Sequence, residues 1–235
     1  MNDFRAPGTA KIHEHPILAH NAYCEWFSSG NVPLDELRRF TVQFSVFSHL
    51  FLEAQLRKCL NAPDLPSYRA SKDILLNELG VAQCSVGHFE WLVEFGLAIG
   101  LDFEHLGRRY FATPTTLSFC DTLIDVYGNP DPATAGGASY ALEHWAAAGF
   151  WHSIIQGLRH IRRSRIPKLP LGYWVWHGHL DARRVEATEA ALFRFSHGTR
   201  DEQERFLAAG VTVLDAVQTF WDGLNEDREA LLACG

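Results

Sequence analysis

Residues 173–184 read YWVWHGHLDARR, and this stretch decides how the rest of the chain is interpreted. It follows proline and glycine residues that mark a helix entry and runs into helix-forming sequence, so it predicts the first turns of a long helix. On such a helix His177, Asp181 and Arg184 share one face. Taken alone, the stretch favours a partly buried histidine that hydrogen-bonds the aspartate, because buried polar groups need partners. The rest of the chain decides whether these residues belong to a larger site.

The chain has helical periodicity throughout and no alternating pattern of useful length, which predicts an all-α protein. A length of 235 residues without internal repeats fits one domain, so we expect a single bundle of seven or eight helices over residues 1–235. Residues 1–10 and 226–235 are expected to be loose termini. Proline, glycine and capping residues place the helices at roughly 14–28, 31–60, 67–79, 88–99, 113–128, 131–163, 173–196 and 199–224. Glycines 136, 137 and 149 are candidate bends in the sixth.

Composition excludes several classes of protein. The net charge of −7 argues against nucleic acid as the main partner. Five cysteines without a C-x-x-C motif fit reduced thiols, and no apolar run is long enough to span a bilayer, so we expect a soluble cytoplasmic protein with no membrane partner. Basic residues cluster at 159–168, which fits a helix C-terminus. A local anion contact is the alternative interpretation.

Several expected helices carry ionisable residues within apolar sequence. Each one alone is explained by solvation or by a satisfied core histidine, but together they form a pattern. Carboxylates and imidazoles that project inward from facing helices build di-iron and di-manganese sites in bundles. The repeated Glu-x-x-His motif of ferritin-like bundles is absent, so another bundle is indicated. These residues are His49, Glu53, Glu78, His88, Glu143, His144, His177 and Asp181.

The chain resembles the haem-oxygenase-like bundle superfamily, and within it the haem-oxygenase-like di-iron oxidases and oxygenases. Residues 15–18 and 30–40 resemble that family's first helix and the start of its second. Residues 77–80, followed by 87–89, resemble the region that contributes a carboxylate and a histidine ligand. The stretch 177–184 matches the family's His-x-x-x-Asp-x-x-His motif in two of three positions. The resemblance covers nearly the whole chain.

The resemblance implies a ligand set and a chemistry. The implied metal ligands are Glu78, His88, Glu143, His177 and Asp181, with Glu53 as a weaker candidate. The implied cofactor is Fe(II), two ions per chain if the site is complete, with O₂ as co-substrate. The substrate would be a small organic molecule such as an amino acid, amine or carboxylate, and members often form homodimers. The substrate pocket would lie near Trp145, Trp151 and Trp174, for which core packing is the alternative.

Arg184 departs from the family pattern, because a guanidinium has no lone pair to offer a metal. One iron position is then lost, or it is supplied by another residue such as Glu53, His179 or Glu186. Alternatively Arg184 contacts the substrate or is the counter-ion of a carboxylate, without a metal. The first hypothesis is therefore an iron-dependent, O₂-activating oxidase or oxygenase. The second is a cofactor-independent enzyme like those of the TenA and PqqC families, with Arg184 in the metal position, and the third is a non-catalytic partner protein.

Overall fold

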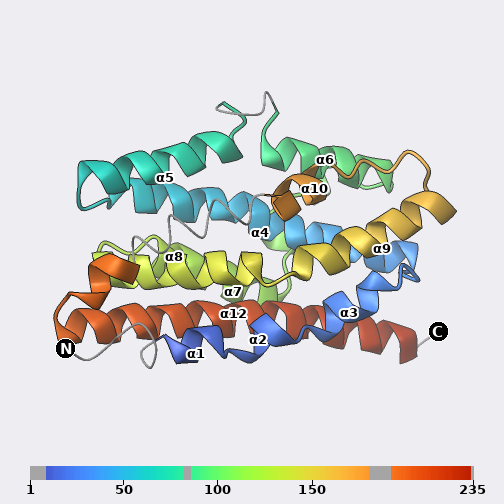
Figure 1. Ribbon diagram of the computed structural model, residues 1–235. Coiled ribbons are helices and arrows are strands. Elements are labelled where there is room, and N and C mark those ends of the chain that lie inside the picture. The colour runs from blue at the N-terminus through green and yellow to red at the C-terminus, as the bar shows by residue number, and fades with distance from the viewer. Residues whose placement is uncertain (1–8, 82–85, 180–191, 234–235) are drawn as a thin grey trace.

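The computed structural model describes residues 9–81, 86–179 and 192–233. Throughout these ranges the regular structure is helical, which confirms the all-α prediction (Figure 1). The helices are α1 (Ala10–His13), α2 (Pro16–Ala19), α3 (Ala22–Ser28), α4 (Leu34–Leu60), α5 (Leu65–Glu78), α6 (His88–Ala98), η1 (Phe103–His105), η2 (Arg109–Phe111), α7 (Pro114–Thr122), η3 (Leu123–Tyr127), α8 (Pro132–Ala147), α9 (Phe150–Ser164), α10 (Gly172–His179) and α12 (Arg200–Ala233).

The long helices α4 and α12 organise the bundle (Figure 1). Helix α12 runs the length of the molecule and packs against α7, α8 and the N-terminal helices α1–α3. Helix α4 packs against α5, α6 and α7, and α9 packs against α3 and α10. The aromatic core lies between these helices and includes the fully buried Phe40, Phe44, Trp174 and Trp221. Helices α5, α6 and α10 therefore meet on the side of α4 opposite α12.

The N-terminal segment differs from the expected single helix over 14–28, because that range forms two short helices, α2 and α3, and a further short helix, α1, precedes it. His15 precedes Pro16 and has extended backbone (φ −62°, ψ 132°), as the residue before a proline prefers. Asn21 is also extended, and its side chain accepts a hydrogen bond from the Cys24 amide (2.9 Å), so a new helix begins there. Local capping thus overrides the continuous apolar pattern.

The expected helix over 131–163 is two helices. Gly149 adopts the left-handed conformation (φ 93°), which glycine enters without steric cost, and it separates α8 from α9. Gly136 and Gly137, the other candidate bends, lie inside α8. At Gly137 a Cβ would collide with the backbone oxygen of Phe206 on α12, so this glycine permits close helix packing.

Helix α12 begins as expected and continues further than expected. The Thr199 hydroxyl accepts from the Glu202 amide (3.3 Å), and the Glu202 carboxylate accepts from the Thr199 amide (2.7 Å), which is a capping box. The helix continues past 224 to Ala233, so residues 226–233 are helical instead of a loose tail. No helix among the described residues combines the length and the apolar character needed to cross a membrane.

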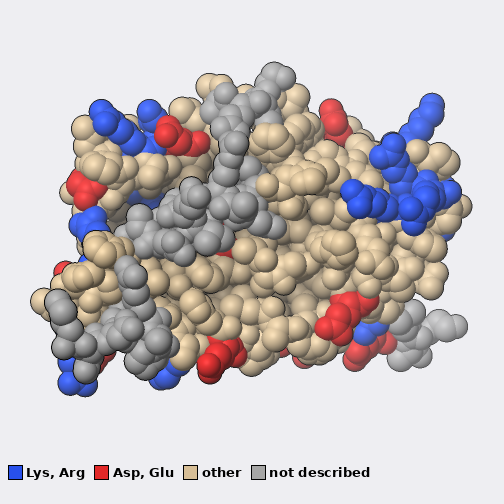
Figure 2. Space-filling view, viewed as in Figure 1, with Lys and Arg blue, Asp and Glu red and all other residues tan. Residues whose placement is uncertain are grey.

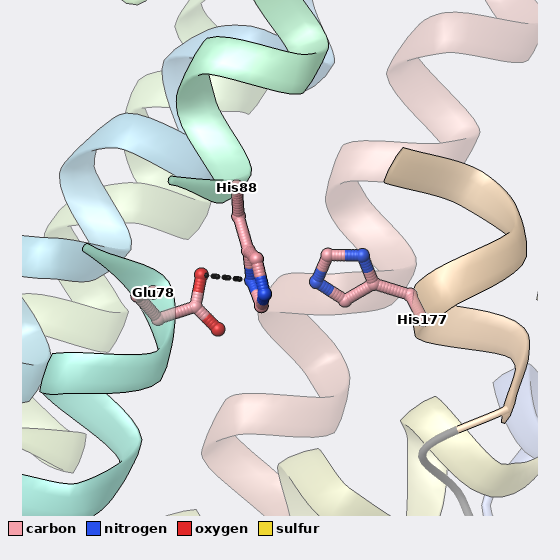
Figure 3. A group of neighbouring side chains, drawn as sticks. All are labelled: Glu78, His88 and His177. Atoms are coloured by element: carbon pink, nitrogen blue, oxygen red, sulfur yellow. Dashed lines mark hydrogen bonds and ion pairs between the residues drawn. The ribbon is translucent and has the colours of Figure 1, made fainter. Parts of the chain in front are cut away.

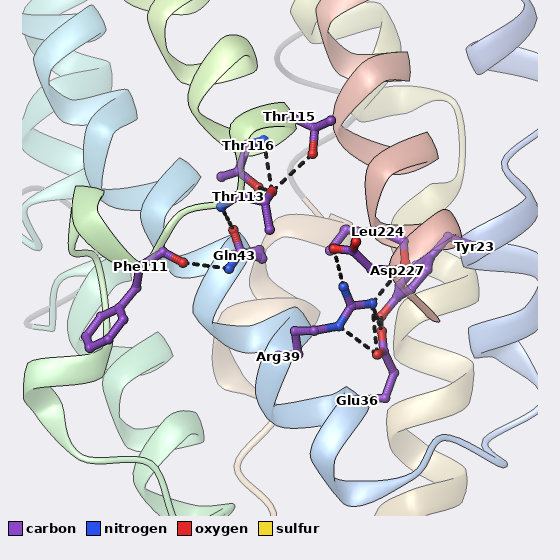
Figure 4. A network of polar contacts seen from close by, with 10 residues as sticks. All are labelled: Tyr23, Glu36, Arg39, Gln43, Phe111, Thr113, Thr115, Thr116, Leu224 and Asp227. Atoms are coloured by element: carbon purple, nitrogen blue, oxygen red, sulfur yellow. Dashed lines mark hydrogen bonds and ion pairs between the residues drawn. The ribbon is translucent and has the colours of Figure 1, made fainter. Parts of the chain in front are cut away.

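Buried polar contacts join α12 to α3 and α4 near this end (Figure 4). The Glu36 carboxylate is almost fully buried and accepts hydrogen bonds from the Tyr23 hydroxyl (2.7 Å) and the Arg39 guanidinium (2.9 Å). Arg39 also donates to Asp227 (2.5 Å) and to the Leu224 carbonyl (3.0 Å). Each buried charge therefore has a partner, as the low dielectric of a core requires.

Candidate metal centre

Three residues from α5, α6 and α10, the helices drawn at the top of Figure 1, converge on one another (Figure 3). Glu78 is the last residue of α5, His88 is the first residue of α6, and His177 lies on α10. All three are buried, and one potential ligand atom from each lies within 4.8 Å of the other two. The structure therefore assembles three of the predicted ligands into one group.

A tight chain reversal brings Glu78 and His88 together. Helix α5 ends at Glu78, and Gly80 then adopts a positive φ of 82°. A Cβ on Gly80 would lie 2.5 Å from the Gly87 backbone nitrogen, so only glycine allows the chain to approach this closely before α6. Glutamate and histidine, ten positions apart, consequently face each other across the two helix ends.

His88 is held by Glu78 and keeps one nitrogen unsatisfied. Its Nδ1 donates to Glu78 Oε2 at 2.8 Å, because an ionised carboxylate can only accept. The proton on Nδ1 leaves the lone pair on Nε2, which is buried and has no hydrogen-bond partner among the described residues. Trp91 stacks parallel to the ring (5.9 Å between centroids, 8°). A buried lone pair without a donor is costly, and a cation would satisfy it.

His177 faces His88 from the side opposite Glu78 (Figure 3). Its Nδ1 donates to the Tyr173 carbonyl one helical turn back (2.7 Å), which leaves the lone pair on Nε2. The centroids of the His88 and His177 rings lie 4.7 Å apart, and the planes of the two rings make an angle of 72°. Trp151 stacks on His177 (4.9 Å, 23°), and Tyr173 also lies against it (4.3 Å). Aromatic rings therefore enclose both histidines and limit the access of water.

The residue types fit a first-row transition metal. One carboxylate and two neutral imidazoles are the donor set of many non-haem iron sites, whereas magnesium and calcium prefer oxygen ligands. Hydrogen bonds already fix the tautomers of His88 and His177 through their Nδ1 atoms. Such outer partners orient metal-binding histidines in known sites.

Glu143 is buried on α8 but does not complete a four-residue group with these three among the described residues. The Glu143 carboxylate attracts the Lys58 ammonium of α4 electrostatically. That ammonium donates a hydrogen bond to Ser139 Oγ (2.5 Å) and lies 4.2 Å from the centroid of the Tyr127 ring. Burial lowers the pKa of Lys58 to about 8, while attraction to Glu143 opposes that shift. Lys58 is a residue that the sequence pattern did not single out.

Glu53 does not reach the group. Its side chain is 46% exposed and pairs with Arg57 one turn along α4 (2.8 Å). This placement is at odds with its prediction as a ligand, because that part of the helix surface faces solvent. His179, a substitute ligand in the sequence hypothesis, is exposed at the end of α10. Asp181, Arg184 and Glu186 lie outside the described residues, so their roles stay predictions.

The tryptophans expected at the pocket occupy different positions. Trp151 stacks on His177, so it lies beside the group of Glu78, His88 and His177. Trp174 is fully buried against Phe44 (5.0 Å), and Trp145 stacks on Phe150 (4.4 Å), so both pack in the core. Trp91 was not predicted, although its position three residues after His88 puts it on the same helix face.

Comparison with known proteins supports the fold. No protein-family model and no curated protein matches the chain. Several solved structures do match. One is a domain of unknown function with a haem-oxygenase-like fold from Shewanella denitrificans, with a TM-score of 0.70 and 15% sequence identity; the match covers 97% of this chain and 93% of that domain. A CADD-like protein of unknown function from Nostoc punctiforme gives 0.70 at 17% identity, covering 94% and 96%. A TenA homologue from Pseudomonas syringae gives 0.66 at 14% identity, covering 94% and 88%. The chain therefore has the haem-oxygenase-like fold, as the sequence resemblance predicted, and at these identities the likeness shows the fold alone.

Proposed function

We propose that this haem-oxygenase-like chain binds iron between α5, α6 and α10 and is an O₂-activating oxidase or oxygenase of a small organic substrate. The observation that carries the proposal is the buried group of Glu78, His88 and His177, in which His88 Nε2 has no described partner. Interior carboxylate and imidazole groups from separate helices are how bundles hold such metals.

The chain's own residues would divide the work. His88 and His177 would bind iron through Nε2, because their Nδ1 protons are committed to Glu78 and to the Tyr173 carbonyl. Glu78 would orient His88 or turn one oxygen to the metal. Bound ferrous iron would supply the binding and reduction of O₂. The rings of Trp91 and Trp151 would exclude water, which protects reactive chemistry from side reactions.

A second iron depends on further ligands. Glu143 and Asp181 are the proposed additional carboxylates, and Arg184 replaces the histidine that would complete the family motif. Because a guanidinium cannot bind a metal, an Arg184→His variant is expected to gain one iron per chain over the wild type. Equal iron content in the two proteins would contradict this assignment of position 184.

The central test is iron content after anaerobic loading with Fe(II), together with O₂ consumption. His88→Gln and His177→Gln are expected to lose bound iron, whereas His152→Gln is the matched control because His152 is exposed on α9. Candidate amino acids, amines and carboxylates are then screened for substrate-dependent O₂ uptake. Iron-free protein that turns over a substrate at the full rate would refute the proposal.

A cofactor-independent enzyme is the second candidate, and the Glu78–His88 hydrogen bond favours it. A carboxylate that orients a buried imidazole is also how enzymes prepare a general base without a metal. This candidate predicts turnover that is insensitive to chelators and lost in Glu78→Gln. Restoration of activity by Fe(II) after chelation would exclude it.

A further inference from the structure

Three arginines project together from the last turns of α9. Arg159, Arg162 and Arg163 are exposed and share one side of the helix. None of them has a carboxylate partner within the described residues. Most other arginines of the described surface do pair with carboxylates, namely Arg38, Arg39, Arg57, Arg109, Arg194, Arg200, Arg205 and Arg228. Arg69, Arg108 and Arg165 are the described exceptions outside the three. What distinguishes α9 is that three guanidinium groups without a described carboxylate partner lie on adjacent turns of one helix.

These guanidinium groups line a surface groove of about 510 Å³. Its other lining residues are Pro167, Leu171 and Val175, from the segment that leads into α10 and from α10 itself. The segment is anchored, because Arg165 donates to the Gly30 and Val32 carbonyls (3.0 and 2.6 Å). The groove thus has one cationic side and one apolar side on a fixed backbone.

The charge of this region contrasts with that of the whole chain. The net charge is −7, yet basic side chains gather at the end of the molecule where α9 ends (Figure 2). A concentration of one sign in a concave surface attracts ligands of the opposite sign. The groove therefore selects for anions on a protein that otherwise repels them.

We propose that this groove binds a phosphorylated organic molecule with an apolar body. Guanidinium groups match phosphate oxygens with paired hydrogen bonds. Three positive charges suit a phosphate monoester, whose charge near pH 7 is about −1.5 to −2, better than a single carboxylate. The apolar body would lie along Pro167, Leu171 and Val175, and the volume falls in the range of small-molecule sites, about 300–1,000 Å³. The inference rests on the groove alone, so its failure would leave the iron proposal untouched.

The test is calorimetric titration of the full chain with 1-naphthyl phosphate at low salt. Arg162→Gln and Arg163→Gln are each expected to weaken binding about tenfold, because a charge-assisted hydrogen bond is lost. Arg200→Gln is the matched control, since Arg200 is an exposed arginine of α12 paired with Glu204 and lies outside the groove. Circular dichroism confirms that each variant is folded.

The probes separate the possible ligand chemistries. Binding should be weaker for 1-naphthoate, which has one charge, weaker for inorganic phosphate, which has no apolar body, and absent for 1-naphthol. Absence of binding by 1-naphthyl phosphate, equal binding of the phosphate and the carboxylate, or an equal loss in Arg200→Gln would overturn the proposal. Binding only to phosphatidic-acid vesicles would also overturn it, because it would indicate a lipid surface in place of a soluble phosphate ester.

Discussion

Replacing His177 by glutamine should abolish the stabilisation of the protein by Fe(II). A ligand that binds only the folded state adds RT ln(1 + [L]/Kd) to the free energy of unfolding, about 2.7 kcal/mol at a free metal concentration of one hundred times Kd. At 235 residues each kcal/mol shifts Tm by about 2–4 °C, so the wild type should gain about 5–10 °C. Each further tenfold rise in Fe(II) should add about 1.4 kcal/mol.

The structure separates this effect from simple damage to the core. His177 packs between Trp151 and Tyr173, so His177→Gln should cost about 1–3 kcal/mol without metal. That cost is the same with and without Fe(II) and cancels when the metal-dependent gain is compared by anaerobic thermal unfolding. His152→Gln should keep the full gain. A gain in His177→Gln equal to that of the wild type would refute the assignment of His177 as a ligand.

Three further predictions concern the surrounding structure. The pKa of Lys58 is about 8 in the folded chain against 10.5 in the unfolded chain, so the unfolded state binds more protons between these values. Stability should therefore rise with pH across that window, by at most about 3 kcal/mol, and urea unfolding should show no such rise in Lys58→Met. Gly80 and Gly100 both have positive φ, but a Cβ at Gly80 meets backbone whereas one at Gly100 meets the end of a flexible arginine. Gly80→Ala should thus weaken Fe(II) binding in equilibrium dialysis while Gly100→Ala leaves it unchanged, and equal effects would contradict the role of the reversal. Glu36→Ala should cost about 1–3 kcal/mol in urea unfolding, because the buried Tyr23 hydroxyl loses its acceptor while Arg39 keeps Asp227; unchanged stability would contradict this.

Helix boundaries could be predicted where a single local signal dominates. Thr113 and Asp131 cap α7 and α8 ahead of a proline, and both helices begin as expected. The breaks before Pro16 and at Gly149 were harder, because proline is tolerated in a first turn and glycine is tolerated inside a helix. The outcome at each break follows from backbone conformation, since His15 and Asn21 are extended and Gly149 has a positive φ. Residue type permits these conformations without requiring them.

The candidate site shows the same limit. Glu53 lies one turn after His49, and this spacing fixes a common helix face without fixing which neighbour covers it. His49 packs against Phe89 (4.4 Å), whereas the next turn reaches solvent, where Glu53 pairs with Arg57. Spacing along one helix therefore predicts which residues share a face, but it does not distinguish an interior carboxylate from a surface carboxylate.

The convergence of Glu78, His88 and His177 has one local cause and one long-range cause. The first two residues meet because Gly80 lets the chain fold back at two helix ends, a signal present in the sequence. His177 arrives through Trp174, one turn before it, which packs against Phe44 and Phe95. Burial of a whole indole stabilises by several kcal/mol, enough to set the rotation of a helix as short as α10. Trp174, expected in a substrate pocket, is better explained as the anchor that turns His177 toward His88.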